Sequence, residues 1–278
     1  MQLHKIETGN LKLDGGAMFG VVPKTIWEKS YPADENNLCN WSMRCLLVVD
    51  GDRKILIDNG IGDKQDEKFL KHYHLNGDDS LDKSLSALGY SRDDITDMVL
   101  THLHFDHCGG SIIKTGEDQF ETAFKNATYW ISKDQWEWAI NPNHREKASF
   151  LKENILPIEA SGQLKLVENE GELFPGFHVK FYSGHTDGQM IPFVNYNGKT
   201  IVFTADLLPS IAHVPIPYVM AYDTQPLLTL KEKEAFFKEV IENEFVIFLE
   251  HDLYNECCTL EYTEKGPRVK ETFKLETI

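Results

Sequence analysis

The sequence predicts a mixed α/β fold in which two β-sheets pack face to face and helices cover their outer sides. Segments with strand-like apolar patterns occur in both halves of the 278-residue chain. Each set of strands is followed by segments with helical periodicity. Because strands and helices must bury their apolar faces against another layer, this order favours two sheets with helices outside them.

The first half is expected to contain three strands and two helices. Asp50-Gly51-Asp52 lies between two apolar runs and predicts a β-hairpin. Residues 14–40 carry several glycine, proline and asparagine breakers and are expected to form a loop. Strands are predicted at 45–49, 54–58 and 96–101, and helices at 64–74 and 79–88.

The second half is expected to supply the other sheet. Residues 132–153 are predicted to be largely helical with a break near Pro142, and Asn197-Gly198 is typical of a tight hairpin turn. Further elements are predicted as strands at 163–168, 177–182, 190–195, 200–204 and 245–249, and as an amphipathic helix at 229–242.

A cluster of metal-binding residue types directly follows the strand at 96–101. It reads His102-Leu103-His104-Phe105-Asp106-His107 and ends in Gly109-Gly110, where the chain can turn tightly. In an extended segment His102, His104 and Asp106 would project to one side and His107 to the other. One short loop could then supply two neighbouring metal positions. Imidazole and carboxylate groups suit zinc and other first-row divalent ions.

Three more candidate ligands follow other predicted strands. His185 comes just after 177–182, Asp206 after 200–204, and His251 after 245–249. A carboxylate such as Asp206 can bridge two cations, which together lower the pKa of a shared water. The sequence therefore predicts a binuclear centre built from residues at strand ends.

These motifs, Thr101 to Gly110 together with Gly184-His185-Thr186, Asp206 and His251, resemble the metallo-β-lactamase superfamily. The landmarks run from the hairpin near residue 45 to His251. The resemblance implies a single domain over residues 1–278 that folds as a four-layer αββα sandwich of two mixed sheets flanked by helices. It also implies the ligand sets: His102, His104 and His185 on one ion, Asp106, His107 and His251 on the other, and Asp206 shared.

Further features resemble one branch of that superfamily. Residues 14–24 resemble the N-terminal loop of the N-acyl homoserine lactone lactonases and related methyl parathion hydrolases, and residues 104–107 are similar to the lactonases. The complete ligand set with a bridging aspartate resembles the hydrolases that are not true β-lactamases. In the lactonases a tyrosine shortly after that aspartate contacts the substrate carbonyl. This chain has Leu207-Leu208-Pro209-Ser210 there, and Tyr218 and Tyr222 are candidate substitutes.

We therefore expect a binuclear metallohydrolase in which a hydroxide shared by the two ions attacks an ester-like bond. Asp206 and Asp106 are the expected catalytic residues: Asp206 bridges the ions, and Asp106 holds one ion and accepts a proton during the attack. Zinc is the default metal, while iron, manganese or cobalt also fit nitrogen and oxygen ligands. The leading substrate is a small-molecule lactone such as an N-acyl homoserine lactone.

Three alternatives remain open. A phosphotriester hydrolase fits the N-terminal loop equally well. A thioester hydrolase of the glyoxalase II kind would use the same ligands, but that family has a helical glutathione-binding region at its C-terminus, and the tail after His251 is short and strand-like. A non-catalytic metal- or signal-binding protein on the same fold would be marked by a lost ligand, and none is missing.

Residues 17–41 are unusually rich in apolar and aromatic side chains for a loop. Such a loop either caps an apolar substrate pocket or packs against a second subunit of a homodimer, and the sequence favours neither. The candidate pocket residues are Phe19, Val21, Trp27, Tyr218 and Tyr222.

Composition excludes some classes of partner. The formal net charge of −16 argues against binding nucleic acid or an anionic membrane surface. The apolar runs are far too short to span a bilayer. The five cysteines lack the spacing of a disulfide framework. Free thiols fit a reducing compartment, so a cytoplasmic location is expected.

Overall fold

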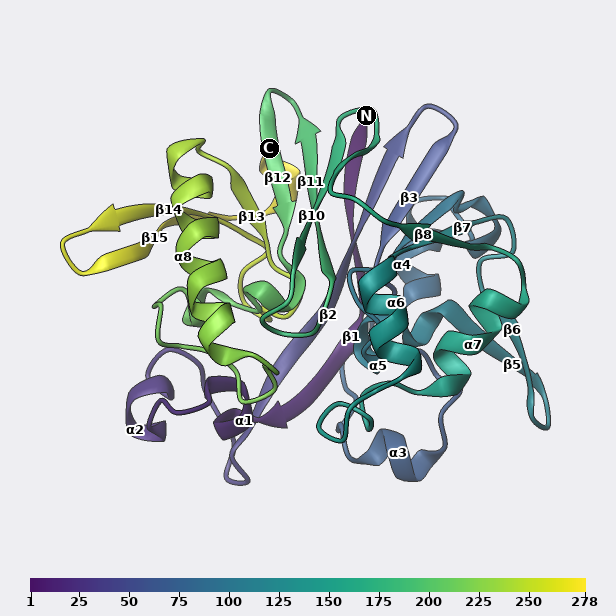
Figure 1. Cartoon of the computed structure of the whole chain (residues 1–278), viewed down its shortest axis with the longest axis horizontal. Helices are drawn as coiled ribbons and strands as arrows, with labels where there is room; N and C mark the ends of the chain where they lie inside the picture. Colours follow the sequence, from purple (N-terminus) through teal and green to yellow (C-terminus); the bar gives the residue numbers. More distant parts are fainter. The chain divides into compact units, whose positions relative to one another are not determined.

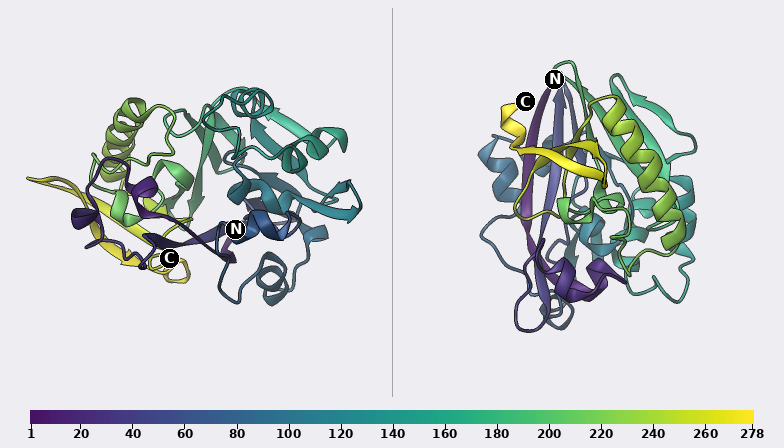
Figure 2. Two further views of the ribbon diagram at one scale, coloured as in Figure 1. Left: turned by 90° about the horizontal axis from the view of Figure 1, so that it is seen from below. Right: turned by 90° about the vertical axis from the view of Figure 1, so that its left-hand side faces the viewer.

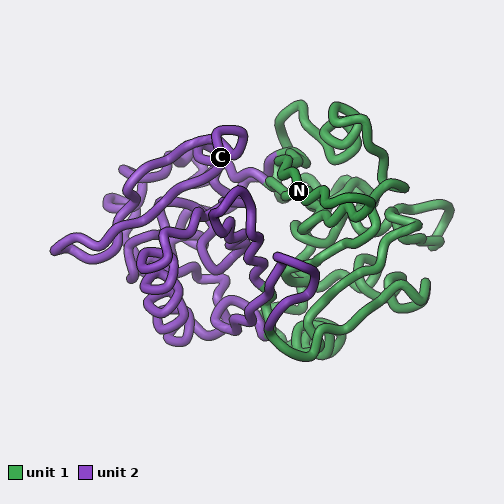
Figure 3. Tube along the Cα trace, turned by 90° about the horizontal axis from the view of Figure 1, so that it is seen from above, with its two compact units in different colours: residues 1–9, 43–170, 188–190 green, residues 10–42, 171–187, 191–278 purple.

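The computed structural model describes residues 1–278, and the chain forms two compact units (Figure 3). Unit 1 comprises residues 1–9, 43–170 and 188–190, and unit 2 comprises residues 10–42, 171–187 and 191–278. Three strands contribute residues to both units: β1 (Gln2–Asp14), β2 (Leu38–Asp50) and β11 (Gln189–Tyr196). Neither unit is therefore one continuous stretch of sequence. The single-domain organisation stays a prediction.

Unit 1 is built on a six-stranded sheet with the order β1-β2-β3-β4-β7-β8 (Figure 1). Strands β3, β4, β7 and β8 are parallel neighbours, whereas β2 and β3 form the antiparallel hairpin that the sequence predicts. The remaining elements are β3 (Arg53–Ile57), α3 (Glu67–Lys71), α4 (Leu81–Ala87), β4 (Asp97–Val99), α5 (Phe105–Cys108), β5 (Ile112–Gly116), β6 (Gln119–Thr122), β7 (Thr128–Ser132), α6 (Lys133–Ile140), α7 (Lys152–Ala160) and β8 (Leu164–Val167).

One face of this sheet packs against the helices of unit 1. Alternate strand residues such as Leu47, Leu56 and Met98 project to that face because side chains alternate along a strand. They form a continuous buried core with Leu85 of α4 and Trp136 of α6. This core fixes the end of β4, after which the four candidate ligands of unit 1 follow.

Unit 2 is built on a seven-stranded sheet with the order β15-β14-β13-β12-β11-β10-β9. Helix α8 starts at a proline, which is favourable in the first helical turn, and packs on the sheet, where the rings of Phe236 and Tyr182 lie 6.2 Å apart. The hairpin of β14 and β15 projects from the unit (Figures 1 and 2). The remaining elements are α1 (Gly15–Phe19), α2 (Lys24–Trp27), β9 (Gly171–Phe174), β10 (Phe177–Tyr182), β12 (Lys199–Phe203), α8 (Pro226–Glu242), β13 (Val246–Phe248), β14 (Cys257–Thr263) and β15 (Gly266–Phe273).

Short 3₁₀ turns complete the chain, at Arg92–Asp94, Gly109–Ser111, Ala205–Leu207, Ile211–His213 and Leu275–Thr277. The turn predicted at Asn197-Gly198 is confirmed, with φ of 50° and 75°, the left-handed values that such a hairpin requires. No helix of the structure has both the length and the apolar character needed to span a membrane.

Two predictions of local structure are wrong in part. The break predicted near Pro142 is confirmed, because α6 ends at Ile140, but residues 132–153 are not largely helical, because α7 begins only at Lys152. Between them the side chain of Asn143 accepts hydrogen bonds from the backbone of Arg145 and Glu146, so the chain turns there. Residues 14–40 are not loop alone, because the Asp14 carboxylate caps the short helix α1.

Candidate metal centre

Four of the predicted ligands follow strand β4 in unit 1. Because β3 and β4 are parallel neighbours, with Ile57 opposite Val99, the residues after each strand meet at the same edge of the sheet. Asp58 follows β3 directly, and its carboxylate accepts hydrogen bonds from the Thr101 amide at 2.8 Å and the Thr101 hydroxyl at 2.7 Å. These bonds fix the point at which the histidine segment begins.

The side chains of this segment converge. His102 Nε2 and His104 Nδ1 lie 3.1 Å apart, and the rings of His102 and His107 have centroids 3.9 Å apart. The carboxylate of Asp106 lies 3.8 Å from His107 Nε2. All four side chains are buried. Unit 1 therefore presents three imidazoles and one carboxylate in a single small region.

The expected alternation of side chains along this segment is wrong beyond His104. Residues 105–108 form the short helix α5, with the amides of His107 and Cys108 both donating to the His104 carbonyl at 3.1 Å. The helical turn brings His107 next to His102 instead of sending it to the opposite side. Gly109 permits the close packing that follows, because a Cβ there would lie 2.0 Å from the carbonyl oxygen of Ile61.

Two histidines of unit 1 have a carboxylate at the ring nitrogen that faces away from the cluster. His107 Nδ1 lies 3.1 Å from Asp58, and His104 Nε2 lies 3.4 Å from Glu146. The Glu146 carboxylate is itself held at 2.6 Å by the indole of Trp138 and by the amide of Asn143. A carboxylate at one ring nitrogen favours the tautomer that leaves the other nitrogen free to bind a metal ion.

The three predicted ligands of unit 2 also follow strand ends. Strands β12 and β13 are parallel, with Val202 opposite Ile247, so Asp206 and His251 emerge at one edge. The two oxygens of Asp206 lie beside different histidines: Oδ1 lies 3.0 Å from His251 Nε2, and Oδ2 lies 3.0 Å from His185 Nε2. This is the arrangement expected of a carboxylate shared by two cations.

The histidines of unit 2 are held at their other ring nitrogens as well. His185 Nδ1 lies 2.9 Å from the Asp223 carboxylate, and His251 Nδ1 lies 2.8 Å from the backbone carbonyl of Ser42. Burial alone would lower the pKa of His185, but the carboxylates of Asp206 and Asp223 together raise it to about 10. A bound cation would therefore have to replace a proton at this ring.

The residues of both units fit divalent metal ions. Each unit brings only nitrogen and oxygen donors. Four of the five imidazoles have a carboxylate or a carbonyl at the outer ring nitrogen, as is usual around metal-binding histidines, and His102 Nδ1 lies 3.0 Å from the Thr101 hydroxyl. Asp106 and Asp206 are each 8% exposed and His104 is 7% exposed, whereas His102 and His107 are fully buried. Both aspartates therefore keep a small contact with solvent.

Four of these orienting groups were not predicted from the sequence. Asp58 could have been found, because it is the last residue of the strand predicted at 54–58 and directly follows β3 in the structure. Glu146, Asp223 and the Ser42 carbonyl lie in irregular segments or mid-strand and carry no sequence signal. Their roles depend on tertiary contacts.

The aromatic side chains of the N-terminal segment largely pack on one another. Phe19 and Trp27 stack at 4.9 Å and are buried in what we call the aromatic cluster, which consists of Met18, Phe19, Trp27, Tyr31, Cys39, Trp41, Ala212 and Met220. Tyr218 is half-buried against it. Of the other candidate pocket residues, Val21 is 92% exposed and Tyr222 is 40% exposed. Among the candidate pocket residues, only Val21 and Tyr222 have a large solvent-exposed surface.

His213 connects the aromatic cluster to the segment after Asp206. Its Nε2 donates to the Met18 carbonyl at 2.9 Å, its Nδ1 accepts from the Ser210 hydroxyl at 2.8 Å, and its ring stacks on Phe19 at 4.6 Å. Burial lowers the pKa of His213 to about 3, so the ring is neutral at physiological pH. The Ser210 hydroxyl is thus engaged with His213.

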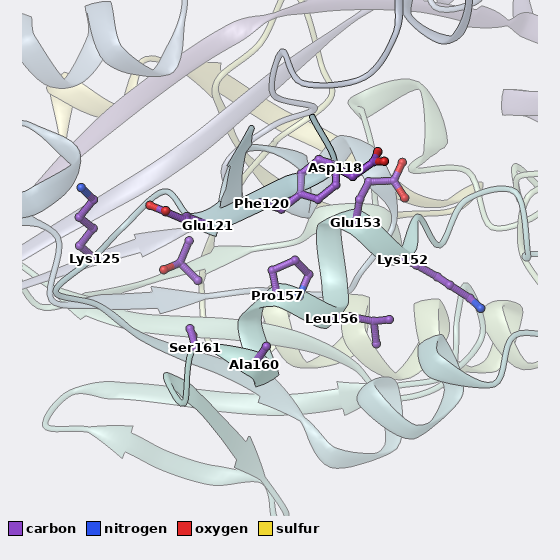
Figure 4. A pocket seen from close by; sticks show the side chains of 11 residues that line it. Asp118, Phe120, Glu121, Lys125, Lys152, Glu153, Leu156, Pro157, Ala160 and Ser161 are labelled. Carbon is purple, nitrogen blue, oxygen red and sulfur yellow. The ribbon is translucent and has the colours of Figure 1, made fainter. Parts of the chain in front are cut away.

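A surface pocket of about 960 Å³ lies between β6 and α7 of unit 1 (Figure 4). Phe120, Leu156 and Pro157 form its apolar part, and charged side chains such as Glu121 and Lys152 surround them. None of the predicted metal ligands lines it. The pocket is therefore separate from the candidate metal ligands of unit 1.

Comparison with known proteins places this geometry in a family. Residues 44–248, most of the chain, match the family model of the metallo-beta-lactamase superfamily. The chain belongs to the metallo-β-lactamase superfamily. The predicted fold class and the predicted enzyme class, a hydrolase with the metal-binding motif of that superfamily, are confirmed.

Its relatives include lactonases. The chain is 26% identical over 233 residues to the N-acyl homoserine lactonase AiiA of Bacillus thuringiensis subsp. kurstaki, which covers 79% of this chain and 84% of the relative. Among solved structures, a probable metal-dependent hydrolase from Staphylococcus aureus is 31% identical, with a TM-score of 0.89 and coverage of 100% and 98%. The dizinc quorum-quenching lactonase AidC shares the fold, with a TM-score of 0.80, 22% identity and coverage of 98% and 95%.

Proposed function

We propose that this protein is a binuclear metal-dependent hydrolase that opens lactones, with N-acyl homoserine lactones as the leading substrate. The observation that carries the proposal is the Asp206 carboxylate, whose two oxygens each lie 3.0 Å from the Nε2 atom of a different histidine. The substrate class is supported by relatives named N-acyl homoserine lactonase.

In this proposal His102, His104 and His185 hold one ion, Asp106, His107 and His251 hold the second, and Asp206 is shared. Zinc is the default metal, and iron, manganese or cobalt suit the same donors. When bound, such ions lower the pKa of water to near neutrality and polarise the reacting carbonyl.

The chain's own residues orient the histidine ligands and accept the proton. Asp58 and Glu146 keep His107 and His104 in the tautomers that can bind metal. Asp106, which is slightly exposed, accepts the proton of the attacking water at its carboxylate. No hydroxyl of the segment after Asp206 is free to contact a substrate carbonyl, because Ser210 is engaged with His213. We assign that contact to Tyr222, and we place Val21 against the substituent of the lactone. Phe19, Trp27 and Tyr218 would support this pocket from behind.

A substrate panel tests the proposal on one purified sample. N-acyl homoserine lactones, a thioester of glutathione and an aryl phosphotriester are supplied to the zinc-loaded protein, and initial rates are compared. We expect kcat/KM to be highest for the lactones. Faster hydrolysis of the thioester or the phosphotriester would replace the substrate class, and inertness toward all three would favour a binding protein.

The strand hairpin that follows His251 already differs from the helical tail of the glyoxalase II type. The homodimer, the cytoplasmic location and the absence of nucleic-acid or membrane partners stay predictions.

A further inference from the structure

We infer that Asp223 is a positioning residue for His185, and that residues 220–225, the link segment, couple the aromatic cluster to that histidine. The inference rests on the proposed role of His185 as a metal ligand. It concerns contacts within unit 2 alone, and it assigns a function to a carboxylate that lies outside the ligand set.

The ring of His185 is fixed by a short contact. Asp223 Oδ1 lies 2.9 Å from His185 Nδ1, and both side chains are nearly inaccessible to solvent. An ionised carboxylate can only accept a hydrogen bond, so Nδ1 must carry the proton. The lone pair of the neutral ring is then at Nε2, the atom that also lies beside Asp206.

The link segment also holds the backbone around His185. The amide and the hydroxyl of Thr224 donate to the His185 carbonyl at 3.0 and 3.1 Å. The amide of Gln225 donates to the Gly184 carbonyl at 2.9 Å, and its side chain donates to the Ser183 carbonyl at 3.0 Å. The link segment therefore contacts both the ring and the main chain of His185.

The other end of the link segment is packed on helix α1. Met220 is buried in the aromatic cluster, and the amide of Ala221 donates to the Ala17 carbonyl at 2.8 Å. At the end of α1, a Cβ on Gly20 would lie 2.3 Å from the Val219 carbonyl oxygen, and the Gly20 φ of 58° is also one that favours glycine. This close approach ties the position of α1 to that of residues 219–221, and through them to His185.

The role of Asp223 is tested by zinc affinity, measured in competition with a chromophoric chelator. Removing an outer partner of a metal ligand typically costs about 10–100-fold in affinity, and we expect that loss for Asp223→Ala. Asp223→Asn should lose less, because its amide oxygen can still accept from Nδ1. Glu232→Gln is the matched control: Glu232 accepts from the amides of Ser183 and Gly184 at 2.7 and 2.9 Å without touching the ring.

The expected pattern separates positioning from general stabilisation. Glu232→Gln should lower the melting temperature of the metal-free protein and reduce zinc affinity much less than Asp223→Ala, which should lose affinity while still folded. Wild-type zinc affinity in Asp223→Ala, or an equal loss in Glu232→Gln, overturns the inference. If the wild-type protein itself binds no zinc or other divalent ion, the proposed function fails as well, so the two failures are distinguishable.

The coupling is tested at the other end of the link segment. Gly20→Ala should weaken zinc binding by a smaller factor than Asp223→Ala, because the clash with Val219 displaces the link segment. Gly51→Ala is the control, since Gly51 has the same φ of 58° but no atom within 4 Å of the added Cβ. Met220→Ala perturbs the same end without a clash and replaces Gly20→Ala if that variant does not fold. If the folded Gly20→Ala variant, or Met220→Ala in its place, binds zinc as tightly as Gly51→Ala, the coupling is overturned.

Discussion

The two units supply their candidate ligands in different ways. In unit 1 four ligands lie within six consecutive residues, His102 to His107, and one turn of helix α5 brings them together. In unit 2 His185, Asp206 and His251 come from the ends of three separate strands, and sheet pairing brings them together. The first set depends mainly on local structure, and the second depends on tertiary packing. Distant substitutions should therefore disturb the ligands of unit 2 more than those of unit 1.

The largest effect is expected for Asp206→Asn. A neutral amide is a poor bridge between two cations, so we expect kcat to fall by more than about 100-fold, beyond the range typical of residues outside the ligand set, and at least one metal to bind less tightly. Steady-state kinetics and metal content measure this. Full activity with two metals bound would show that Asp206 is not the shared ligand.

Asp58→Asn probes the orienting group of unit 1. Asparagine tolerates the Asp58 φ of 57°, so the backbone should be kept while the charge beside His107 is lost. We expect metal affinity to fall by about tenfold, at the low end of the range for such partners. Chelator competition measures the change, with the exposed Asp52→Asn as control. A loss no greater than that of Asp52→Asn would leave Asp58 with a structural role only.

His213→Ala tests whether unit 2 depends on packing remote from the ligands. The variant loses two hydrogen bonds and the stacking on Phe19, which together contribute roughly 2–4 kcal/mol to the free energy of unfolding. Urea unfolding of the metal-free protein measures this, and the exposed His144→Ala should match wild type. Equal stability of the two variants would indicate that the aromatic cluster holds the segment after Asp206 without His213.

The smallest effect concerns the exposed residue Val21. If it contacts the acyl chain of the substrate, each buried methylene contributes about 0.8 kcal/mol, close to a fourfold gain in kcat/KM. The gain should continue with each added methylene until the pocket is full. Val21→Asp should reduce the increase of kcat/KM with acyl chain length without removing metal. Ile140→Asp, at an exposed position of unit 1, is the control. A flat chain-length profile that Val21→Asp does not alter would favour a role of residues 17–41 in a dimer contact.

The same difference between the units decides what the sequence could predict. The ligands of unit 1 stand out because four metal-binding side chains occur together, although the sequence predicts an extended segment at Asp106, where the structure has a helical turn. In unit 2 the strand-end positions and the family resemblance pointed to the ligands, but no pattern indicates that Asp223 lies beside His185. The aromatic residues of 17–41 were recognised as unusual, yet composition could not show that Phe19 and Trp27 bury themselves against each other.

The most direct test of the binuclear centre is metal stoichiometry. The protein is purified without added metal, incubated with zinc, freed of excess ion and analysed by elemental mass spectrometry. Seven nitrogen and oxygen ligands with one shared carboxylate predict about two ions per chain. Loss of the Asp206 bridge in Asp206→Asn should lower that value. A reproducible single ion per wild-type chain, not raised by further zinc, would contradict the account.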